Sequence, residues 1–499
     1  MGKGKYFIGL DQGTTGTTAL ILDENWNMVS RGYAEQKQYY PQSGWVEHDP
    51  IELWENAKSS INSALEKAGL QINDITVMGL DNQGETVVVW NKNTGIPLYN
   101  AIVWQDRRTS RAADRLNEEW GSVIKEKTGL IVDAYFSALK IKWVLDNVDG
   151  AREQAENGEL LAGTLDSWLI WKLTGGRLHI TDYTTASRTM LMNINHGCWD
   201  EEILHKLQIP MSMLAEIRSS SEYYGDTDPT VFLGGAVPIA GSAVDQQAAL
   251  FGQACLEPGT VKTTYGTGCF MLMNTGNKMI ESNNGLLPTV AWGIDGKLTF
   301  ALDAGVYITG AAIQWLRDGI QIVESASQTE ELARSVPDTG GVYFVPAFVG
   351  LAAPYWDQYA RGTMVGITGG TTRAHIARAT LESIAYQVAE NLEVMRKDTN
   401  IDIQVMRVDG GAVENDFLMQ FQADLLGIPV DVPVITETTP LGAAYLAALA
   451  MGEFKNMEEI SSKWKLKKRF VPQISQEERE GLMEGWRAAV ERSRTWAKV

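Results

Sequence analysis

Apolar and polar positions alternate along the chain in blocks that predict both strands and helices. The stretch YFIGLDQGTTGTTALILD (6–23) has apolar runs on either side of a polar glycine–threonine segment, which is typical of strand, tight turn, strand. GTVKTTYGTGCFMLMNTG (259–276) repeats this arrangement about half a chain later. Two such hairpins predict a duplicated architecture with a cleft between two lobes.

Segments with helical periodicity lie between and after these hairpins. In residues 50–69 apolar positions recur at helical spacing, with Asp49 placed to cap the helix and Gly69 to end it. The mixture of helices and strands predicts an α/β protein in which helices cover layered sheets. Further helices are expected at 137–148, 310–320, 373–397, 440–452 and 475–496, and further strands at 341–348 and 404–411.

The stretch GLDNQGETVVVW (79–90) raises a question about its glycine. Apolar runs at 75–80 and 86–90 predict strands of a buried sheet, and the polar residues DNQGE (81–85) separate them. A two-residue hairpin turn needs fewer polar groups than this. The segment is either a strand end with a surface loop or part of a pocket for a polyhydroxy ligand, in which Gly84 leaves out a bulky side chain.

Composition narrows the range of partners. The formal net charge of −19 repels a phosphate backbone, so we expect no nucleic-acid partner. No apolar run reaches the roughly 20 residues that a membrane span needs, and the N-terminal stretch lacks an apolar core of signal-peptide length. The three widely spaced cysteines match neither a disulfide framework nor a metal-ligand pattern, and the five histidines are scattered. A reduced, cytoplasmic setting is expected.

Two glycine–threonine loops are suited to phosphate. In LDQGTTGTT (10–18) small residues let the backbone approach a phosphate closely, and threonine hydroxyls add donors. Asp11 is placed at a strand end, where it can hold Mg²⁺ directly or through water. YGTG (265–268) repeats these features, so the two loops can hold one nucleotide from opposite lobes. The pattern is neither the Walker loop nor the dinucleotide fingerprint.

Two further segments carry candidate chemistry. Asp245 in IAGSAVDQQAALFGQ (239–253) follows small residues and precedes an apolar helix start. It is either a helix cap or a general base that accepts a proton from an attacking hydroxyl. In RVDGGAVENDFLMQ (407–420) paired glycines permit a base or ribose to lie against the backbone, with Asn415 near the next helix start. This segment favours an adenosine site.

These stretches together resemble the FGGY family of carbohydrate kinases, and within it the glycerol kinases, over nearly the full length. The resemblance implies the actin-like ATPase fold, with two ribonuclease-H-like lobes and an active-site cleft between them. We place the N-terminal lobe at 1–253 and the C-terminal lobe at 254–499. The matching motifs are GLDQGTTGT, GWVEHDP, YNAIVWQDRRT, DYTTASRTMLMNI, DQQAALFGQ, YGTGCFMLMNTG, IQWLRD, APYWD, ARG, RVDGGAV and LGAAYLA.

The resemblance also implies an activity, MgATP-dependent phosphorylation of a terminal hydroxyl on a small polyol. Glycerol, giving glycerol 3-phosphate, is the expected substrate, and a homodimer or homotetramer the expected assembly. Asp245 would be the base and Asp11 the Mg²⁺-associated carboxylate. The residues expected at the polyol are Gly84, Glu85, Trp104, Tyr135, Asp245, Gln246 and Phe270. The residues expected at the nucleotide are Thr14, Thr15, Gly16, Thr18, Thr267, Gly310, Gln314, Gly411 and Asn415.

Two departures from the family pattern bear on the substrates. Gly84 stands where the family has an arginine that donates to the glycerol hydroxyls, which removes up to five donors and a large volume. A longer polyol such as erythritol would use that volume. Thr18 stands where the family usually has an arginine near the nucleotide phosphates. The alternatives to a glycerol kinase are therefore a kinase for a longer polyol and a nucleotide-binding regulator without turnover.

Overall fold

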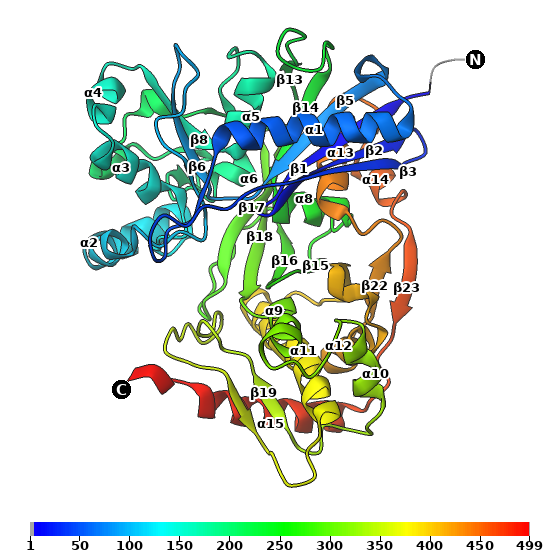
Figure 1. Cartoon of the computed structure of the whole chain (residues 1–499). Helices are drawn as coiled ribbons and strands as arrows, with labels where there is room; N and C mark the ends of the chain where they lie inside the picture. The colour runs from blue at the N-terminus through cyan, green and yellow to red at the C-terminus, as the bar shows by residue number, and fades with distance from the viewer. Residues whose placement is uncertain (1–3, 499) are drawn as a thin grey trace. The chain divides into compact units, whose positions relative to one another are not determined.

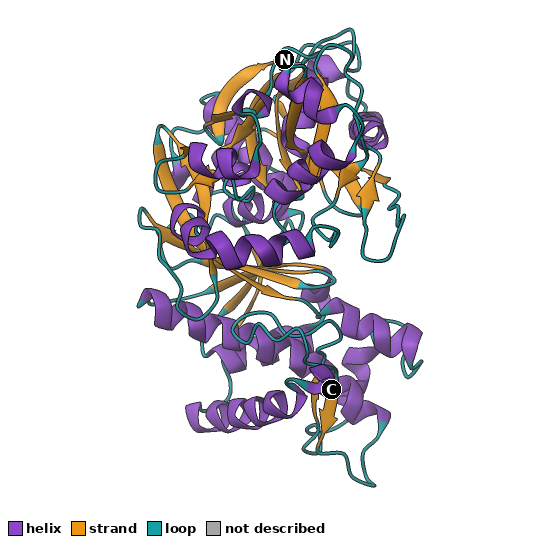
Figure 2. Cartoon of the chain, turned by 90° about the vertical axis from the view of Figure 1, so that its left-hand side faces the viewer, coloured by secondary structure: helices purple, strands orange, loops and turns teal. Residues whose placement is uncertain are grey.

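The computed structural model describes residues 4–498 and divides into two compact units. Unit 1 comprises Met1–Ala254, Thr289–Phe300 and Thr438–Lys463, and unit 2 comprises Cys255–Pro288, Ala301–Glu437 and Trp464–Val499. Unit 1 therefore takes in two segments that follow residue 254 in the sequence. Both units contain helices and strands (Figure 2), so the predicted α/β class is confirmed.

Unit 1 is built on a six-stranded sheet with the strand order β13-β14-β5-β1-β2-β3. The first predicted hairpin is confirmed, because β1 (Tyr6–Gln12) pairs antiparallel with β2 (Gly16–Asp23). On its other side β1 pairs parallel with β5, which pairs parallel with β14. The remaining strands of the sheet are β3 (Met28–Glu35), β5 (Ile75–Asn82), β13 (Ser221–Asp226) and β14 (Pro238–Val244).

Helix α1 (Pro50–Ala68) packs on β2 and β3 (Figure 1) and confirms the predicted helix. The side chain of Asp49 accepts a hydrogen bond from the backbone N–H of Ile51. Gly69 ends the helix with φ of 66°, in the left-handed region that glycine adopts without strain. Both ends of the helix are therefore set by local sequence.

Helix α13 (Thr438–Ala450) covers the opposite face of the sheet at very close range. A Cβ added at Gly9 would lie 1.8 Å from the carbonyl oxygen of Pro440, and one at Gly79 would lie 2.0 Å from that of Ala443. Only glycine permits this approach of helix to strand. The other helices of unit 1 are α2 (Ser110–Thr128), α3 (Ser137–Asn147), α4 (Ala151–Glu156), α5 (Leu165–Leu173), α6 (Tyr183–Ala186), α7 (Glu201–Leu207), α8 (Asp245–Gly252) and α14 (Met457–Ser461).

The strands on either side of Gly84 belong to two different sheets, so the expectation of one sheet is wrong. β5 lies in the six-stranded sheet, whereas β6 (Val87–Asn91) lies in a four-stranded sheet of order β4-β7-β6-β8. The chain turns sharply between them, because Glu85 has φ of 57° and the N–H of Thr86 donates to the carbonyl of Gly84 at 2.7 Å. The other short strands of unit 1 are β4 (Glu47–His48), β7 (Ala101–Ile102), β8 (Leu160–Thr164), β9 (Ile180–Asp182), β10 (Met192–Asn193), β11 (Cys198–Trp199) and β12 (Glu216–Arg218).

The main sheet of unit 2 repeats the pairings of the first, which confirms the predicted duplication. β15 (Val261–Tyr265) pairs antiparallel with β16 (Cys269–Gly276) and parallel with β21 (Met406–Gly410), and β21 pairs parallel with β22 (Val430–Pro433). The full strand order is β17-β18-β16-β15-β21-β22-β23. The sheet also contains β17 (Leu287–Ile294), β18 (Lys297–Val306) and β23 (Leu466–Phe470); the segment Thr289–Phe300, with most of β17 and the start of β18, is assigned to unit 1. A separate pair is formed by β19 (Tyr343–Val345) and β20 (Thr363–Val365).

The C-terminal helix α15 (Gln476–Ser493) packs on the core of unit 2, beside β19 (Figure 1). Its Trp486 is fully buried and stacks on Tyr386 with ring centroids 5.1 Å apart. The amphipathic tail of the sequence therefore belongs to the folded unit. The other helices of unit 2 are α9 (Gly310–Gln314), which continues as a π-helical turn over Trp315–Gly319, α10 (Gln328–Arg334), α11 (Arg373–Thr399) and α12 (Asp416–Leu426).

Candidate active site

Three carboxylates gather at the carboxyl ends of neighbouring parallel strands in unit 1. The register pairs Asp11 of β1 with Asp81 of β5, and Asp245 directly follows β14. Asp81 is fully buried, whereas Asp11 and Asp245 are partly exposed. Burial, and then the negative charges of Asp11 and Asp245, raise the pKa of Asp81 well above its usual range. This edge of the sheet is therefore suited to attract a cation or a proton.

Asp245 is the first residue of helix α8. The residue at the cap position is Val244, so Asp245 does not act as the N-cap. Its Oδ1 accepts a hydrogen bond from the backbone N–H of Gln246 at 2.7 Å. This backbone contact at the start of α8 fixes the orientation of the Asp245 carboxylate.

The loop between β1 and β2 is held from the side of its carbonyl oxygens. Gln36 Nε2 donates to the carbonyls of Gly13 and Thr14, each at 2.7 Å, and Gln83 Nε2 donates to Gly13 at 3.1 Å. The N–H of Gly13 donates to the carbonyl of Gly16 at 3.1 Å and closes the turn. The loop conformation is therefore fixed by two buried amide side chains.

A predicted nucleotide residue and a predicted polyol residue touch in unit 1. Trp104 Nε1 donates to Thr14 Oγ1 at 2.9 Å, and this hydroxyl donates to Gln83 Oε1 at 3.4 Å. Trp104 also packs edge-on against Tyr135, with ring centroids 5.7 Å apart. The fold therefore brings together Thr14, Trp104 and Tyr135, which are far apart in the sequence.

Glu85 lies at the centre of a buried polar cluster. Arg188 Nε donates to Glu85 Oε1 at 2.7 Å, and the Arg188 guanidinium lies 5.9 Å from the ring centre of Tyr135. Lys140 Nζ donates to the carbonyl oxygens of Glu85 at 3.0 Å and of Tyr135 at 2.6 Å. Burial raises the pKa of Glu85 against the opposing effect of Arg188, and burial lowers the pKa of Lys140 to about 7.

The space beside Gly84 is filled by its neighbours. A Cβ added to Gly84 would lie 2.7 Å from Val244 Cγ2 and 3.9 Å from Arg188 Cγ. The first distance is shorter than a real contact, so Val244 occupies the position where a side chain would begin. The backbone of Gly84 is outside the left-handed region, which its neighbour Glu85 adopts instead. The volume expected beside Gly84 is therefore not open at this point.

Thr18 has a guanidinium beside it, supplied by another strand. It is buried on β2, opposite Asp11 in the ladder with β1. Arg31 Nη2 on β3 lies 3.5 Å from Thr18 Oγ1, at the outer limit of a hydrogen bond. The exposed loop residue Thr15 accepts a bond at its carbonyl from the hydroxyl of Tyr33 at 3.4 Å.

In unit 2 the second glycine–threonine loop closes against the start of helix α9. The carbonyl of Thr267 accepts hydrogen bonds from the N–H groups of Thr309 and Ala311, both at 3.0 Å. The N–H of Gly310 donates to the carbonyl of Gly266 at 3.1 Å, and a Cβ at Gly310 would lie 2.5 Å from that oxygen. Thr267 and Gly310 are therefore neighbours, as the predicted nucleotide site requires.

The paired glycines Gly410 and Gly411 lie at the carboxyl end of β21, where Gly410 pairs with Tyr265 at the end of β15. Gly410 has φ of 90°, and a Cβ there would lie 2.2 Å from the carbonyl oxygen of Tyr265. Gly411 follows at the surface, and Asn415 caps helix α12 by accepting from the N–H of Leu418 at 2.9 Å. This capping bond accounts for Asn415 in the fold, independently of any nucleotide.

Two further predicted residues of unit 2 occupy ordinary positions in the fold. Phe270 lies on β16, with its ring 3.7 Å from where a Cβ of Gly305 would be. Gln314 is the exposed last residue of α9. Neither position by itself indicates a ligand.

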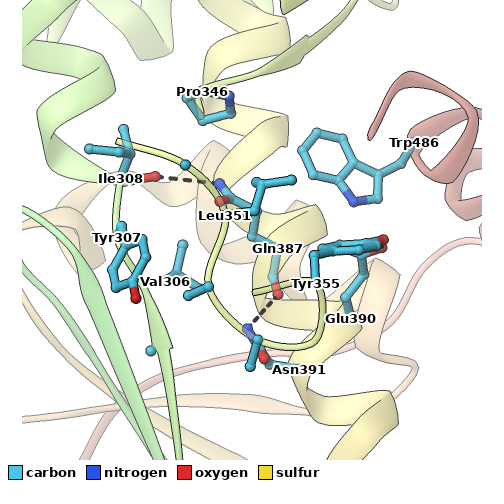
Figure 3. Close-up of a pocket in the computed structure, with 14 residues that line it drawn as sticks. Val306, Tyr307, Ile308, Pro346, Leu351, Tyr355, Gln387, Glu390, Asn391 and Trp486 are labelled. Carbon is cyan, nitrogen blue, oxygen red and sulfur yellow. Dashed lines mark hydrogen bonds between the residues drawn. The ribbon is translucent and has the colours of Figure 1, made fainter. Parts of the chain in front are cut away.

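A pocket in unit 2 is distinct from the predicted site residues (Figure 3). Gln387 Nε2 donates to the carbonyl of Ile308 at 3.4 Å, and Asn391 Nδ2 donates to the carbonyl of Gln387 at 3.1 Å. The hydroxyl of Tyr355 donates to Glu390, whose pKa is raised to about 7 by burial. None of the predicted polyol or nucleotide residues is among those that line this pocket.

The described part of the chain contains neither a group of three potential metal ligands nor a helix suited to span a membrane. Between residues 4 and 498 no three His, Cys, Asp or Glu side chains form a group that could hold a metal ion. Burial lowers the pKa of both His48 and His179 to about 4, so both imidazoles are neutral core groups. No helix of the same range is long and apolar enough to cross a membrane.

Sequence reasoning missed Asp81, Lys140 and Arg188. Asp81 and Arg188 stand inside the motifs DNQGE and DYTTASRTMLMNI, so a charged residue within a matching motif was the available signal. Lys140 lies in the segment SALKIKWVLDNV, where a lysine at helical spacing suggests an exposed face. Its full burial follows only from the tertiary structure.

The comparison with known protein families shows to which family of enzymes the chain belongs. Residues 6–252 match the N-terminal domain of the FGGY family of carbohydrate kinases, and residues 261–451 match the C-terminal domain of the same family. The chain belongs to the FGGY family of carbohydrate kinases. This FGGY kinase is therefore a phosphotransferase with the two-domain fold of that family.

The relatives of this FGGY kinase include several glycerol kinases. It is 59% identical to glycerol kinase 2 of Thermotoga maritima, over 99% of this chain and 100% of the relative. It is 58% identical to the glycerol kinase of Caldanaerobacter subterraneus subsp. tengcongensis, over 99% of each chain. The crystal structure of Plasmodium falciparum glycerol kinase with ADP is similar with a TM-score of 0.91, at 35% identity and 98% coverage of both chains.

Proposed function

We propose that this protein is an ATP-dependent glycerol kinase, which transfers the γ-phosphoryl group of ATP to a terminal hydroxyl of glycerol. The observation that carries the proposal is the position of Asp245 at the end of the parallel strand β14, on the same sheet as the loop-bearing pair β1–β2 and separated from it by β5. In the proposed reaction, Asp245 accepts the hydroxyl proton while the oxygen attacks phosphorus. The bond from phosphorus to the ADP oxygen breaks, and ADP and glycerol 3-phosphate are the products.

Each of the two glycine–threonine loops is proposed to contact nucleotide phosphate. Thr14, Thr15, Gly16 and Thr18 would contact it from unit 1. Support comes from the hydrogen bonds that fix the conformation of the first loop. The second loop is likewise held by backbone hydrogen bonds, which join it to the start of α9. The remaining proposed nucleotide contacts are Thr267, Gly310, Gln314, Gly411 and Asn415.

A magnesium ion fits the carboxylate edge of unit 1. The residues present fit such an ion, because the fully buried carboxyl of Asp81 lies against the carboxyl of Asp11 and the two bring acidic oxygens together. Carboxylate oxygens are what Mg²⁺ prefers, completed by water and phosphate oxygens. Asp11 would hold the ion, which when bound neutralises charge on the transferring phosphates.

The polyol is proposed to contact Glu85, Tyr135, Asp245 and Gln246, with Trp104 as an apolar wall. Support comes from the buried cluster in which Arg188 and Lys140 hold Glu85 and Tyr135. Glycerol is favoured over erythritol because relatives 56–59% identical over the full chain are named glycerol kinases. The filled space at Gly84 argues in the same direction. A regulator without turnover is not favoured either. The roles of Gly84 and Phe270 at the polyol, the homo-oligomer, the lack of a nucleic-acid partner and the cytoplasmic location stay predictions.

A coupled assay of ADP release tests the proposed function across three- to five-carbon polyols. We expect the highest kcat/KM for glycerol, and Asp245→Asn is expected to lose about 10²–10⁴ in kcat while ADP binding by calorimetry is retained. Asp149→Asn is the matched control, since it makes the same substitution at an exposed aspartate outside the proposed site. A tenfold preference for a longer polyol, or near-native turnover of Asp245→Asn, would contradict the proposal.

A further inference from the structure

The edge strand β3 places a tyrosine beside the first glycine–threonine loop. In the ladder between β2 and β3, Tyr33 stands directly opposite Thr18 and diagonal to Gly16, with which β2 begins after the loop. Diagonal neighbours on one face of a sheet are within reach of an aromatic side chain. Tyr33 is 46% exposed, whereas Gly16 is buried. The tyrosine therefore stands at the surface beside the point where the loop enters the sheet.

The ring of Tyr33 occupies the place where a side chain at position 16 would stand. A Cβ added to Gly16 would lie 2.4 Å from both Cε2 and the hydroxyl oxygen of Tyr33, and 2.5 Å from its Cζ. These distances are far below an ordinary van der Waals contact, so an added methyl group would displace the ring. The φ of Gly16 lies outside the left-handed region, so its backbone conformation does not by itself require glycine. The requirement comes from the ring of Tyr33.

The carbonyl oxygens of the loop accept hydrogen bonds from β3 and the segment after it. The carbonyl of Thr15 accepts from the hydroxyl of Tyr33 at 3.4 Å and from the N–H of Gln36 at 3.1 Å. The side chain of Gln36 donates to the two preceding carbonyls, at 2.7 Å each. Within a trans peptide the C=O and the next N–H point in opposite directions. The N–H groups of residues 14–16 therefore point away from β3, an arrangement that suits a bound anion.

The contact between Tyr33 and Gly16 does more than cover a strand. An aromatic ring over a glycine of the neighbouring strand stabilises any sheet by shielding the bare backbone. Here the shielded glycine joins the loop to β2, and the Tyr33 hydroxyl bonds the carbonyl of Thr15 just before it. We propose that Tyr33 is a positioning residue for the nucleotide, which holds Thr15 and Gly16 so that the N–H groups of the first loop face its phosphates.

Tyr33 acts through the loop and does not itself touch the nucleotide. Without the ring, the backbone at Thr15 and Gly16 gains conformational freedom, and a bound phosphate must then order it at a cost in affinity. The cost falls on ligands that carry phosphates, and adenosine is spared. The inference rests on the proposed function in taking a nucleotide as the ligand of this loop.

Calorimetric titration of the full-length protein with ADP and with adenosine tests this role. We expect Tyr33→Ala to weaken ADP binding by about tenfold and adenosine binding by less than about twofold. Tyr40→Ala is the matched control, because Tyr40 is 67% exposed and its hydroxyl bonds Gln38, outside the loop. It should leave both affinities within about twofold. Unchanged ADP affinity of Tyr33→Ala, or an equal loss for ADP and adenosine, would overturn the proposal.

A double-mutant cycle between positions 16 and 33 shows whether the ring acts through the glycine. Gly16→Ala displaces the ring, so it should weaken ADP binding nearly as much as Tyr33→Ala does. In the Tyr33→Ala background the added methyl group meets no ring, and the double variant should bind ADP about as well as Tyr33→Ala alone. Losses that simply add would mean that the two residues act independently, and would overturn the proposal.

Two further variants separate positioning from sheet stability. Tyr33→Phe keeps the ring and should bind ADP within about threefold of the wild type, because the lost hydroxyl bond is long. Tyr33→Thr removes the ring but suits a strand, so it serves if the alanine variant does not fold. A ring-less variant with a lower Tm and wild-type ADP affinity would assign Tyr33 to sheet stability alone and overturn the proposal.

The titrations contain no polyol, so the two proposals can fail separately. A protein that shows these ADP effects but does not phosphorylate glycerol would retain this inference and reject the proposed function. A protein that phosphorylates glycerol, and whose Tyr33→Ala variant binds ADP as the wild type does, would retain the proposed function and reject this inference.

Discussion

Arg188 and Glu85 form a buried ion pair, with 2.7 Å between Nε and Oε1 and side-chain exposures of 5% and 4%. The two residues come from different parts of unit 1, and neither charge is tolerable there without the other. The Arg188 guanidinium also lies over the ring of Tyr135. A cation therefore stands next to Glu85 although position 84 is a glycine.

Replacing Arg188 by methionine is expected to lower the free energy of unfolding by about 3–5 kcal/mol, because Glu85 then remains buried without its partner. Arg188 lowers the pKa of Glu85, so its loss raises that pKa further above the ordinary value. Glu85 therefore keeps its proton to a higher pH than in the wild type, so the KM for glycerol should be raised and should decrease towards the wild-type value as the pH increases. Urea unfolding and steady-state kinetics measure both effects.

The control for this substitution is Arg152→Met, which removes an exposed ion pair with Asp146 and should change stability by no more than about 1 kcal/mol. The double variant Arg188→Met with Glu85→Gln should regain part of the stability without regaining glycerol affinity. A KM for glycerol that stays at the wild-type value in Arg188→Met would refute the role of the pair in polyol binding.

Gly84→Ala is expected to destabilise the protein by about 1–3 kcal/mol through overpacking against Val244. Adding Val244→Ala removes the methyl group in the way, so the double variant should lose less than the sum of the two single changes. Gly369→Ala is the control, because a Cβ there meets no atom within 4 Å. A double-mutant cycle by urea unfolding gives the coupling energy, and strict additivity would mean that Val244 does not limit position 84.

Lys140 makes stability depend on pH between neutral and alkaline values. Burial lowers its pKa from 10.5 to about 7 in the folded protein, so the unfolded chain binds more protons between these pH values. Stability contributed at this site therefore rises as the pH increases from 7 towards 10.5, by up to about 1.4 kcal/mol per pH unit. Relative to Lys140→Met, the wild type should gain stability at pH 8 and 9 (about one and two units above that pKa) in urea titrations. Parallel curves for the two proteins would exclude the buried lysine as the cause.

Arg31→Met is expected to weaken ADP binding by up to about fivefold at low salt, the range of an exposed charge contact. The reason is that Arg31 supplies the guanidinium near Thr18. Thr18→Arg should restore affinity in the Arg31→Met background and change little in the wild type. Lys58→Met, on helix α1, controls for the general loss of positive charge. Calorimetry at low and high salt measures the difference, which should shrink as salt is added. Equal affinities of wild type and Arg31→Met would place Arg31 away from the phosphates.

The helix ends and the two hairpins could be predicted because each is determined by residues that are neighbours in the sequence. The ends of α1 at Asp49 and Gly69 follow from capping chemistry, and the two hairpins from apolar runs around glycine and threonine. The division of the strands around Gly84 between two sheets was missed, because Glu85 at the turn is held by hydrogen bonds from Ser137, Lys140 and Arg188, which lie far along the chain. The positive φ leaves no mark in the sequence.

Site residues that stand in contiguous motifs could be predicted from the sequence. The contacts between residues that are far apart in the sequence could not. Asp11 and Asp245 stand in characteristic stretches, and the structure places both at the same edge of one sheet. The partner of Glu85 is Arg188, and the neighbour of Gly84 is Val244; both are remote in sequence, so no spacing rule finds them. Only the folded chain shows that a methyl group fills the place expected to be empty.

The close packing of α13 on β1 affects how the protein folds during its synthesis. Ribosomes deliver β1 first, whereas the helix whose Pro440 backbone touches Gly9 emerges only near the end of synthesis. Until then one apolar face of the nascent N-terminal sheet has no cover, and the first unit cannot complete its core co-translationally. A ribosome stalled after residue 254 would carry an unfinished unit that invites chaperone binding, and gene fragments ending there should yield aggregates instead of a domain.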